Sequence, residues 1–194
     1  MRSALIFIAV VAGSLLPNAS RAQDTNAAAP FLIPATKLES FETNIGIVVI
    51  KATTEVGTVS ANTGSVSIKC RENTDTGSGR KESGIAIEIF QRGQGKDRIL
   101  IDYDELNPLL KGLDYLTKLD PSVSSLDTFD AGYNTKGGFR IAALGNRRTG
   151  SIQFAVRDIR TNMSPVLFSR QEMNLFSSLM DQAKKQLDAL GQKQ

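Results

Sequence analysis

Positively charged side chains gather in the last third of this chain, and their spacing points to anion binding. Between positions 136 and 170 the chain has seven Lys and Arg residues and one carboxylate, Asp158. In two neighbouring predicted strands, Arg140 and Arg157 occupy polar positions that alternate with apolar ones, so both can project from one sheet face. Guanidinium groups bind phosphate, sulfate or carboxylate in two-point contacts. The predicted anion-binding residues are Lys136, Arg140, Arg147, Arg148, Arg157 and Arg160.

The segment before this cluster is acidic and leaves two other interpretations open. Positions 97–130 hold eight Asp and Glu residues, including the run Asp102-Tyr103-Asp104-Glu105. Charge runs often form an exposed face, and these acids could pair with the arginines within the fold or between copies. Two carboxylates at a suitable separation could alternatively hydrolyse a glycosidic bond. The run itself has a structural explanation, since Asp102 or Asp104 can cap the helix that follows.

Three residue types limit the chemistry further. The chain has no histidine, which excludes Ser-His-Asp and Cys-His catalysis and removes the commonest zinc, copper and iron ligand. Tryptophan, the best platform for stacking a sugar or a cation, is also absent. Cys70 is the only cysteine and alternates with Val66 and Ile68, which favours a buried structural thiol over a reactive one.

No motif for a cofactor or metal occurs: there is no Walker loop, GxGxxG, HExxH or EF-hand spacing. We therefore predict no catalytic residue, no metal ligand and no cofactor.

The N-terminus has the pattern of a secretory signal peptide. Arg2 precedes an apolar run over residues 4–12, and Ser20-Arg21-Ala22 is a small-x-small cleavage site. The run is short for a membrane span and no second one follows. Cleavage after Ala22 predicts a secreted or periplasmic protein without a transmembrane segment. Loss of Arg2 and Arg21 lowers the formal net charge from +3 to +1, so attraction of the whole molecule to polyanions is weak.

The rest of the chain divides into a leader and two strand-rich units, 41–120 and 121–194, expected to form one compact domain. Residues 23–40 are rich in Ala, Asn and Pro and predict a flexible leader. Short apolar or alternating runs predict strands, and residues 72–83 predict a long solvated loop. Leucines from Leu106 to Leu116 predict a helix that ends at Asp120-Pro121. A second set of strands follows, and a Ser169/Glu172 capping box begins the final helix.

The two units resemble each other. At an offset of 67 residues, five residues of the first unit recur identically in the second, namely Leu100, Glu105, Asn107, Asp114 and Lys118 as Leu167, Glu172, Asn174, Asp181 and Lys185. The same offset aligns Ile85, Ile87 and Ile89 with Ile152, Phe154 and Val156. An offset of 73 aligns Val66, Ile68 and Cys70 with Phe139, Ile141 and Ala143. This predicts an α+β protein of two pseudo-repeated antiparallel units, each closed by an amphipathic helix that packs on sheet.

The tandem units, with Lys136-Gly137-Gly138 and Phe168-Ser169-x-x-Glu172, resemble the Whirly-type single-stranded-DNA-binding fold. The resemblance implies a single-stranded nucleic-acid-binding module and carries over no functional residue. Because export separates the chain from chromosomal DNA, we favour a non-enzymatic binding or envelope-associated protein. Its expected partner is an anionic envelope polymer, a lipid surface or another protein. A carboxylate-dependent hydrolase and a nucleic-acid-binding module stay as alternatives.

Overall fold

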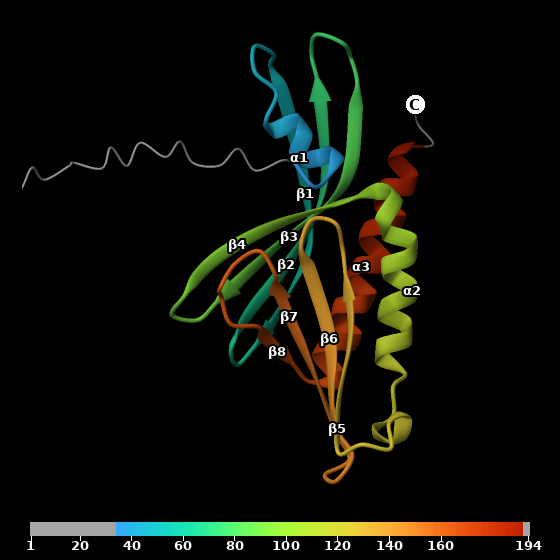
Figure 1. Cartoon of the computed structure of the whole chain (residues 1–194). Helices are drawn as coiled ribbons and strands as arrows, with labels where there is room; N and C mark the ends of the chain where they lie inside the picture. The colour runs from blue at the N-terminus through green and yellow to red at the C-terminus, as the bar shows by residue number, and fades with distance from the viewer. Residues whose placement is uncertain (1–33, 192–194) are drawn as a thin grey trace, which may run out of the picture. The chain divides into compact units, whose positions relative to one another are not determined.

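A computed structural model describes residues 34–191 of the chain. The predicted signal peptide and residues 23–33 of the predicted leader lie outside this range. The described residues form two four-stranded antiparallel sheets, each followed by a helix (Figure 1). The first sheet contains β1 Val49–Ala61, β2 Gly64–Asp75, β3 Lys81–Gln91 and β4 Gly95–Asp102, and the second contains β5 Thr128–Asn134, β6 Phe139–Asn146, β7 Ser151–Asp158 and β8 Val166–Phe168. The helices are α1 Lys37–Glu42, α2 Leu106–Thr117 and α3 Arg170–Gly191, with short 3-10 turns at Tyr103–Glu105 and Pro121–Val123.

This arrangement confirms the predicted α+β class with two similar units. In both sheets the strands follow chain order, so each sheet is a simple meander. The inner sheet faces and the apolar faces of α2 and α3 form one buried cluster that includes Ile68, Leu109, Phe139 and Phe176. The two units therefore share one core. No helix within the described range is long and apolar enough to cross a membrane.

The helices α2 and α3 lie side by side, and each packs on the sheet of the other unit (Figure 1). Helix α3 follows the second sheet but makes most of its sheet contacts with β1 and β2 and fewer with β7 and β8, whereas α2 follows the first sheet but contacts β5 and β6. Gly57 of β1 receives the side chain of Leu179, since a Cβ atom added there would lie 2.8 Å from Leu179 Cδ2. This exchange of helices explains how one core serves both units.

The strand register corrects one part of the predicted duplication. Ile68 pairs with Ile87, and Ile141 pairs with Val156, so the 73-residue offset of the second strands holds. The same pairs relate Ile87 to Val156, an offset of 69 rather than 67 for the third strands. The 67-residue offset returns in the fourth strands, where Ile99 and Val166 occupy equivalent positions. Connections of different length between strands absorb these shifts at little cost.

The predicted loop over residues 72–83 is wrong. Residues 76–81 at the tip of this hairpin are exposed, but most of the polar residues on either side are half-buried, β2 continues to Asp75 and β3 begins at Lys81. The apolar runs over residues 47–50 and 56–61, predicted as separate strands, are joined instead: residues 49–61 form one strand, β1, with a bulge between Glu55 and Gly57.

The expected capping of α2 by Asp102 is wrong as well. The Asp102 carboxylate instead accepts hydrogen bonds from the main-chain N–H groups of Lys37 (2.7 Å) and Leu38 (3.0 Å) in α1. Glu105 accepts the N–H of Lys136 at 2.9 Å. Both acids therefore join segments far apart in sequence, which local spacing cannot reveal. The predicted capping box of α3 is confirmed, because Ser169 and Glu172 exchange hydrogen bonds.

Helix α1 includes the last four residues of the predicted leader, 37–40, and the sequence pattern did not predict this helix. Thr36 and Glu39 form a capping box at its start. Its two apolar residues, Leu38 and Phe41, are fully buried. The helix covers the outer face of the first sheet, on the side away from α3 (Figure 1). Glu42 at its end binds Arg71 (2.8 Å) and Arg98 on that face.

Candidate functional site

The six predicted anion-binding residues fall into two groups at opposite ends of the β6–β7 hairpin. Lys136, Arg140, Arg157 and Arg160 lie at the end formed by the start of β6 and the end of β7. Arg147 and Arg148 lie in the turn between the strands. About seven residues of strand separate the groups, or roughly 20 Å. The structure therefore divides the predicted cluster into two.

The turn group is held by the segment before β5. Arg148 forms a salt bridge with Asp127 at 2.6 Å. Arg147 donates a hydrogen bond from a guanidinium nitrogen to the main-chain oxygen of Ser125 at 2.8 Å. These contacts fasten the β6–β7 turn to the chain that leads into β5.

Three members of the other group contact carboxylates. Arg140 donates to both oxygens of Asp130, at 2.9 and 3.0 Å, and to Asn134. Arg160 bridges Asp158 (3.2 Å) and Glu39 of α1 (2.6 Å). Lys136 lies 3.9 Å from Asp104, the limit of an ion pair.

Arg157 is different from its neighbours. It pairs directly with Arg140 across β6 and β7, so the two arginines lie side by side on the outer face of the second sheet. Within residues 34–191 no carboxylate forms a salt bridge with it. Its Nε is buried and has no hydrogen-bond partner there. Arg157 and Arg147 are thus the two predicted cations without a salt bridge among the described residues, and only Arg157 has a buried nitrogen without a hydrogen-bond partner there. We call Arg140 and Arg157 the arginine pair.

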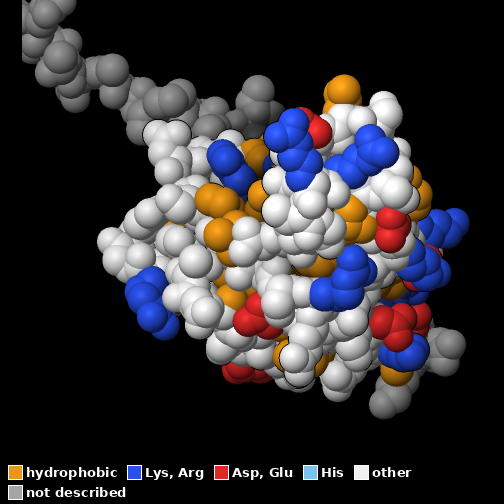
Figure 2. All heavy atoms as spheres, turned by 90° about the horizontal axis from the view of Figure 1, so that it is seen from below, with side chains coloured by type: hydrophobic (Ala, Val, Ile, Leu, Met, Phe, Trp, Pro, Cys, Tyr) orange, Lys and Arg blue, Asp and Glu red, His pale blue; other side chains and the backbone are white. Residues whose placement is uncertain are grey.

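The acidic segment neutralises three of the six predicted cations, Lys136, Arg140 and Arg148. It supplies Asp104, Asp127 and Asp130 as partners of the predicted cations. For these residues, charge pairing within the fold is the observed arrangement. On the face that Figure 2 shows, Lys and Arg side chains are spread out rather than gathered, and Asp or Glu side chains are visible next to some of them.

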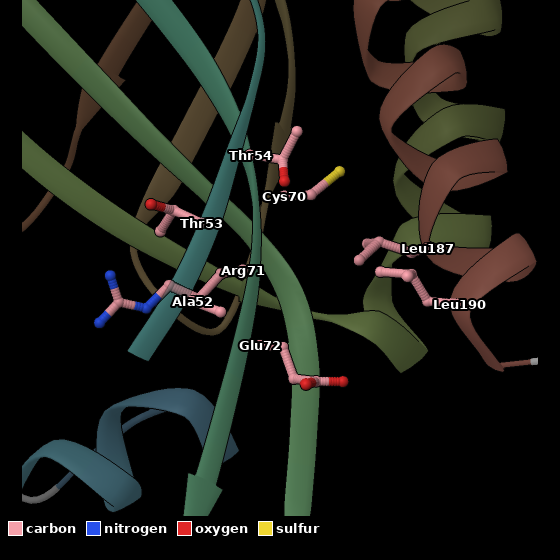
Figure 3. A pocket seen from close by; sticks show the side chains of 8 residues that line it. All are labelled: Ala52, Thr53, Thr54, Cys70, Arg71, Glu72, Leu187 and Leu190. Carbon is pink, nitrogen blue, oxygen red and sulfur yellow. The ribbon is translucent and has the colours of Figure 1, made fainter. Parts of the chain in front are cut away.

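A shallow hollow of about 200 Å³ lies between β1, β2 and the end of α3 (Figure 3). It is lined by Ala52, Thr53, Thr54, Cys70, Arg71, Glu72, Leu187 and Leu190. Glu72 is its one carboxylate and forms a salt bridge with Lys81 at 3.4 Å. Hydrolysis by two carboxylates requires a pair in one cleft, and this hollow does not supply it.

Cys70 at the base of this hollow is a structural thiol. It is 4% exposed, and burial raises its pKa to about 11. Its Sγ lies 3.4 Å from the main-chain oxygen of Ala183 in α3. Because the thiolate is the nucleophilic form, a raised pKa makes this group unreactive near neutral pH.

The sequence pattern did not single out the hollow, since its lining residues come from β1, β2 and α3 and share no local motif. In the part of the chain that the structure describes, no group of three or more Cys, Asp or Glu residues could hold a metal ion. Comparisons with protein-family models, curated proteins and solved structures found no significant match to this chain. The site is therefore interpreted from its own geometry.

Proposed function

We propose that this chain is an exported, non-enzymatic binding protein that contacts anionic groups of an envelope polymer through the arginine pair. Export rests on the predicted signal peptide. The observation that carries the proposed binding is the direct pairing of Arg140 with Arg157, only one of which has a carboxylate partner within residues 34–191.

The arginine pair has an electrostatic reason to bind an anion. Like charges directly opposite each other on neighbouring strands destabilise a sheet. Asp130 offsets this for Arg140, and no comparable contact exists for Arg157 among the described residues. A sulfate, phosphate or carboxylate bound by the guanidinium group of Arg157 would neutralise its charge and reduce its repulsion with Arg140.

The neighbouring strand positions one of the two side chains. A Cβ atom added to Gly132 of β5 would lie 2.7 Å from the guanidinium carbon of Arg140. Only glycine leaves room for Arg140 to lie flat over β5 and reach Asp130. The guanidinium group is thus held in place before any ligand arrives, which lowers the entropic cost of binding.

Binding to dextran sulfate, a soluble sulfated polymer, tests the proposal. The full chain is compared with R140Q/R157Q and with the matched control R147Q/R148Q, which removes the same charge at the other end of the hairpin. We expect R140Q/R157Q to weaken binding by about 10-fold or more, since hydrogen bonds to charged groups contribute about 1.5 to 3 kcal/mol each. The control should change affinity less than threefold, because a general charge effect is weak at physiological salt.

Two results would contradict the proposal. One is an equal effect of the two double variants, and the other is binding that does not depend on salt. A 30-nucleotide oligothymidylate that binds far more tightly than dextran sulfate would favour the nucleic-acid-binding alternative.

A further inference from the structure

The outer edge of β1 is the most open strand edge in the described structure. Six consecutive residues, 50–55, are exposed, although the neighbouring β2 residues Arg71 and Asn73 are buried. Within residues 34–191, the main chain of residues 49–55 forms hydrogen bonds only in its pairing with β2. Half of its N–H and C=O groups therefore point outward, and such an edge is a template for another strand.

Other edges of the two sheets are shorter or covered. Strand β5, an edge of the second sheet, has seven residues and contacts α2. Strand β8 has only three residues. Strand β4 contacts α1 and β6, and Gly137 of the β5–β6 turn packs against the main-chain oxygen of Leu100. Strand β1 has 13 residues and lacks such cover along its first half.

Apolar side chains accompany this open edge. Val48 is 69% exposed and Ile50 is 55% exposed, at the start of β1. Leu190, near the end of α3, is 47% exposed and lines the hollow together with Ala52 and Thr54 (Figure 3). Apolar surface gathered around an unpaired edge indicates a protein contact rather than solvent.

The charged side chains along the open edge of β1 would complement those of a second β1 strand. Lys51 and Glu55 lie two residues before and two residues after Thr53, on the same strand face. If a second β1 strand runs antiparallel about a two-fold axis at Thr53, Lys51 of each chain faces Glu55 of the other. The two Thr53 residues then face each other. We propose that β1 pairs in this way with β1 of a second copy, joining the two first sheets into one eight-stranded sheet.

Two details of the structure are compatible with this pairing. The salt bridge of Lys51 with Glu42 is long, at 3.6 Å, and the Lys51 side chain is 40% exposed, so it can reach the partner's Glu55. The bulge between Glu55 and Gly57 ends the regular part of the edge just beyond the proposed pairs. The contact is thus limited to residues near the axis, and the dimer is expected to be reversible.

Disulfide trapping tests the register. Thr53→Cys in the full chain should form a covalent dimer on mild oxidation, since the two positions face each other within disulfide reach. The matched control is Thr58→Cys, an exposed threonine of the same strand whose two copies would lie roughly 30 Å apart. Buried Cys70 does not interfere. Equal cross-linking of the two variants, or none with Thr53→Cys, would overturn the proposal.

Charge exchange provides an independent test by sedimentation equilibrium. Glu55→Lys should raise the dimer Kd by about 10-fold, because like charges then face each other twice. The double variant K51E/E55K restores opposite charges and should restore the wild-type Kd. Circular dichroism checks that each variant is folded, and Glu42 keeps Arg71 and Arg98 as partners in all of them. A monomeric wild-type chain at 100 µM, or an unchanged Kd for Glu55→Lys, would refute the pairing.

Discussion

Helix α3 packs on the first sheet and helix α2 packs on the second sheet through a large and a small residue. The two contacts differ in whether the helix or the strand supplies the large one. Leu179 of α3 fits over Gly57 of β1, whereas Gly112 of α2 receives the ring of Tyr133 from β5. Gly112 and Leu179 are 67 residues apart, so they hold the same place in the two helices. Gly57 and Tyr133 also correspond, since they face the equivalent residues Ile68 and Ile141.

At these equivalent contacts the two units keep the summed volume of the facing side chains but not the residue types. Where one unit has its large side chain on the helix, the other has it on the strand. Close packing requires only that the summed volume of the facing residues is right. The repeat can therefore persist in three dimensions at positions where the sequences of the two units differ.

The largest expected difference between the units lies just before their helices, at Asp102 and the equivalent Ser169. Asp102 is 2% exposed and holds two N–H groups of α1, whereas Ser169 caps α3 at the surface. We expect Asp102→Ala to lower the free energy of unfolding by about 3 kcal/mol and Ser169→Ala by about 1 kcal/mol. Urea denaturation followed by circular dichroism measures both. A larger loss for Ser169→Ala would mean that α1 contributes little to stability.

The next difference concerns Cys70, whose counterpart in the second sheet is Ala143. The folded-state pKa of Cys70, about 11, lies above its ordinary value of 9.0. The unfolded chain therefore loses this proton first, and stability falls as pH rises from 9 towards 11. We expect the wild-type chain to lose about 2 kcal/mol relative to Cys70→Ala between pH 8 and pH 10.5. Parallel stability profiles of the two proteins would show that the thiol is not shielded from water.

The smallest expected effect concerns the exchanged glycines. A Cβ atom at Gly112 would lie 2.6 Å from the Tyr133 ring, which has few alternative positions, whereas at Gly57 it would meet the flexible end of Leu179. Overpacking costs about 1 to 3 kcal/mol, and replacing a helical glycine by alanine regains about 1 kcal/mol. We expect Gly112→Ala to destabilise by about 1 kcal/mol and Gly57→Ala by less. The reverse order in thermal unfolding would contradict the packing described for the two helices.

Local patterns predicted much of this fold. Alternation at Phe139, Ile141 and Ala143 identified a strand, and the Ser169/Glu172 pair identified the start of α3. Both signals arise from residues a few positions apart. The hairpin end over residues 72–83 was missed because its strand residues are polar. Most are half-buried, and the buried Asn73 forms hydrogen bonds with Arg71 and Leu38 in place of apolar contacts. Helix α1 was missed because it is short and depends on contacts with the first sheet. Asp102 of β4 accepts hydrogen bonds from the start of the helix, and Glu42 at the end of the helix binds Arg71 of β2.

The candidate site was predicted only in part for the same reason. The pairing of Arg140 with Arg157 follows from the hairpin and was anticipated from strand phase. The neutralisation of Arg148 by Asp127 and of Arg160 by Glu39 depends on segments that the fold brings together. The hollow beside β1 likewise exists only where α3 crosses that strand.

The amino-acid sequence by itself determined most of the strands, the helices α2 and α3, the repeated unit and the absence of imidazole chemistry, because period, capping and composition are local properties. Only the tertiary structure decided which sheet each helix packs on, which arginines have a carboxylate partner, and which strand edge is left unpaired. These outcomes depend on contacts between residues far apart in the sequence, such as Arg160 with Glu39, which are 121 positions apart. Their energies come from burial and charge pairing across the shared core, which no short stretch of sequence contains.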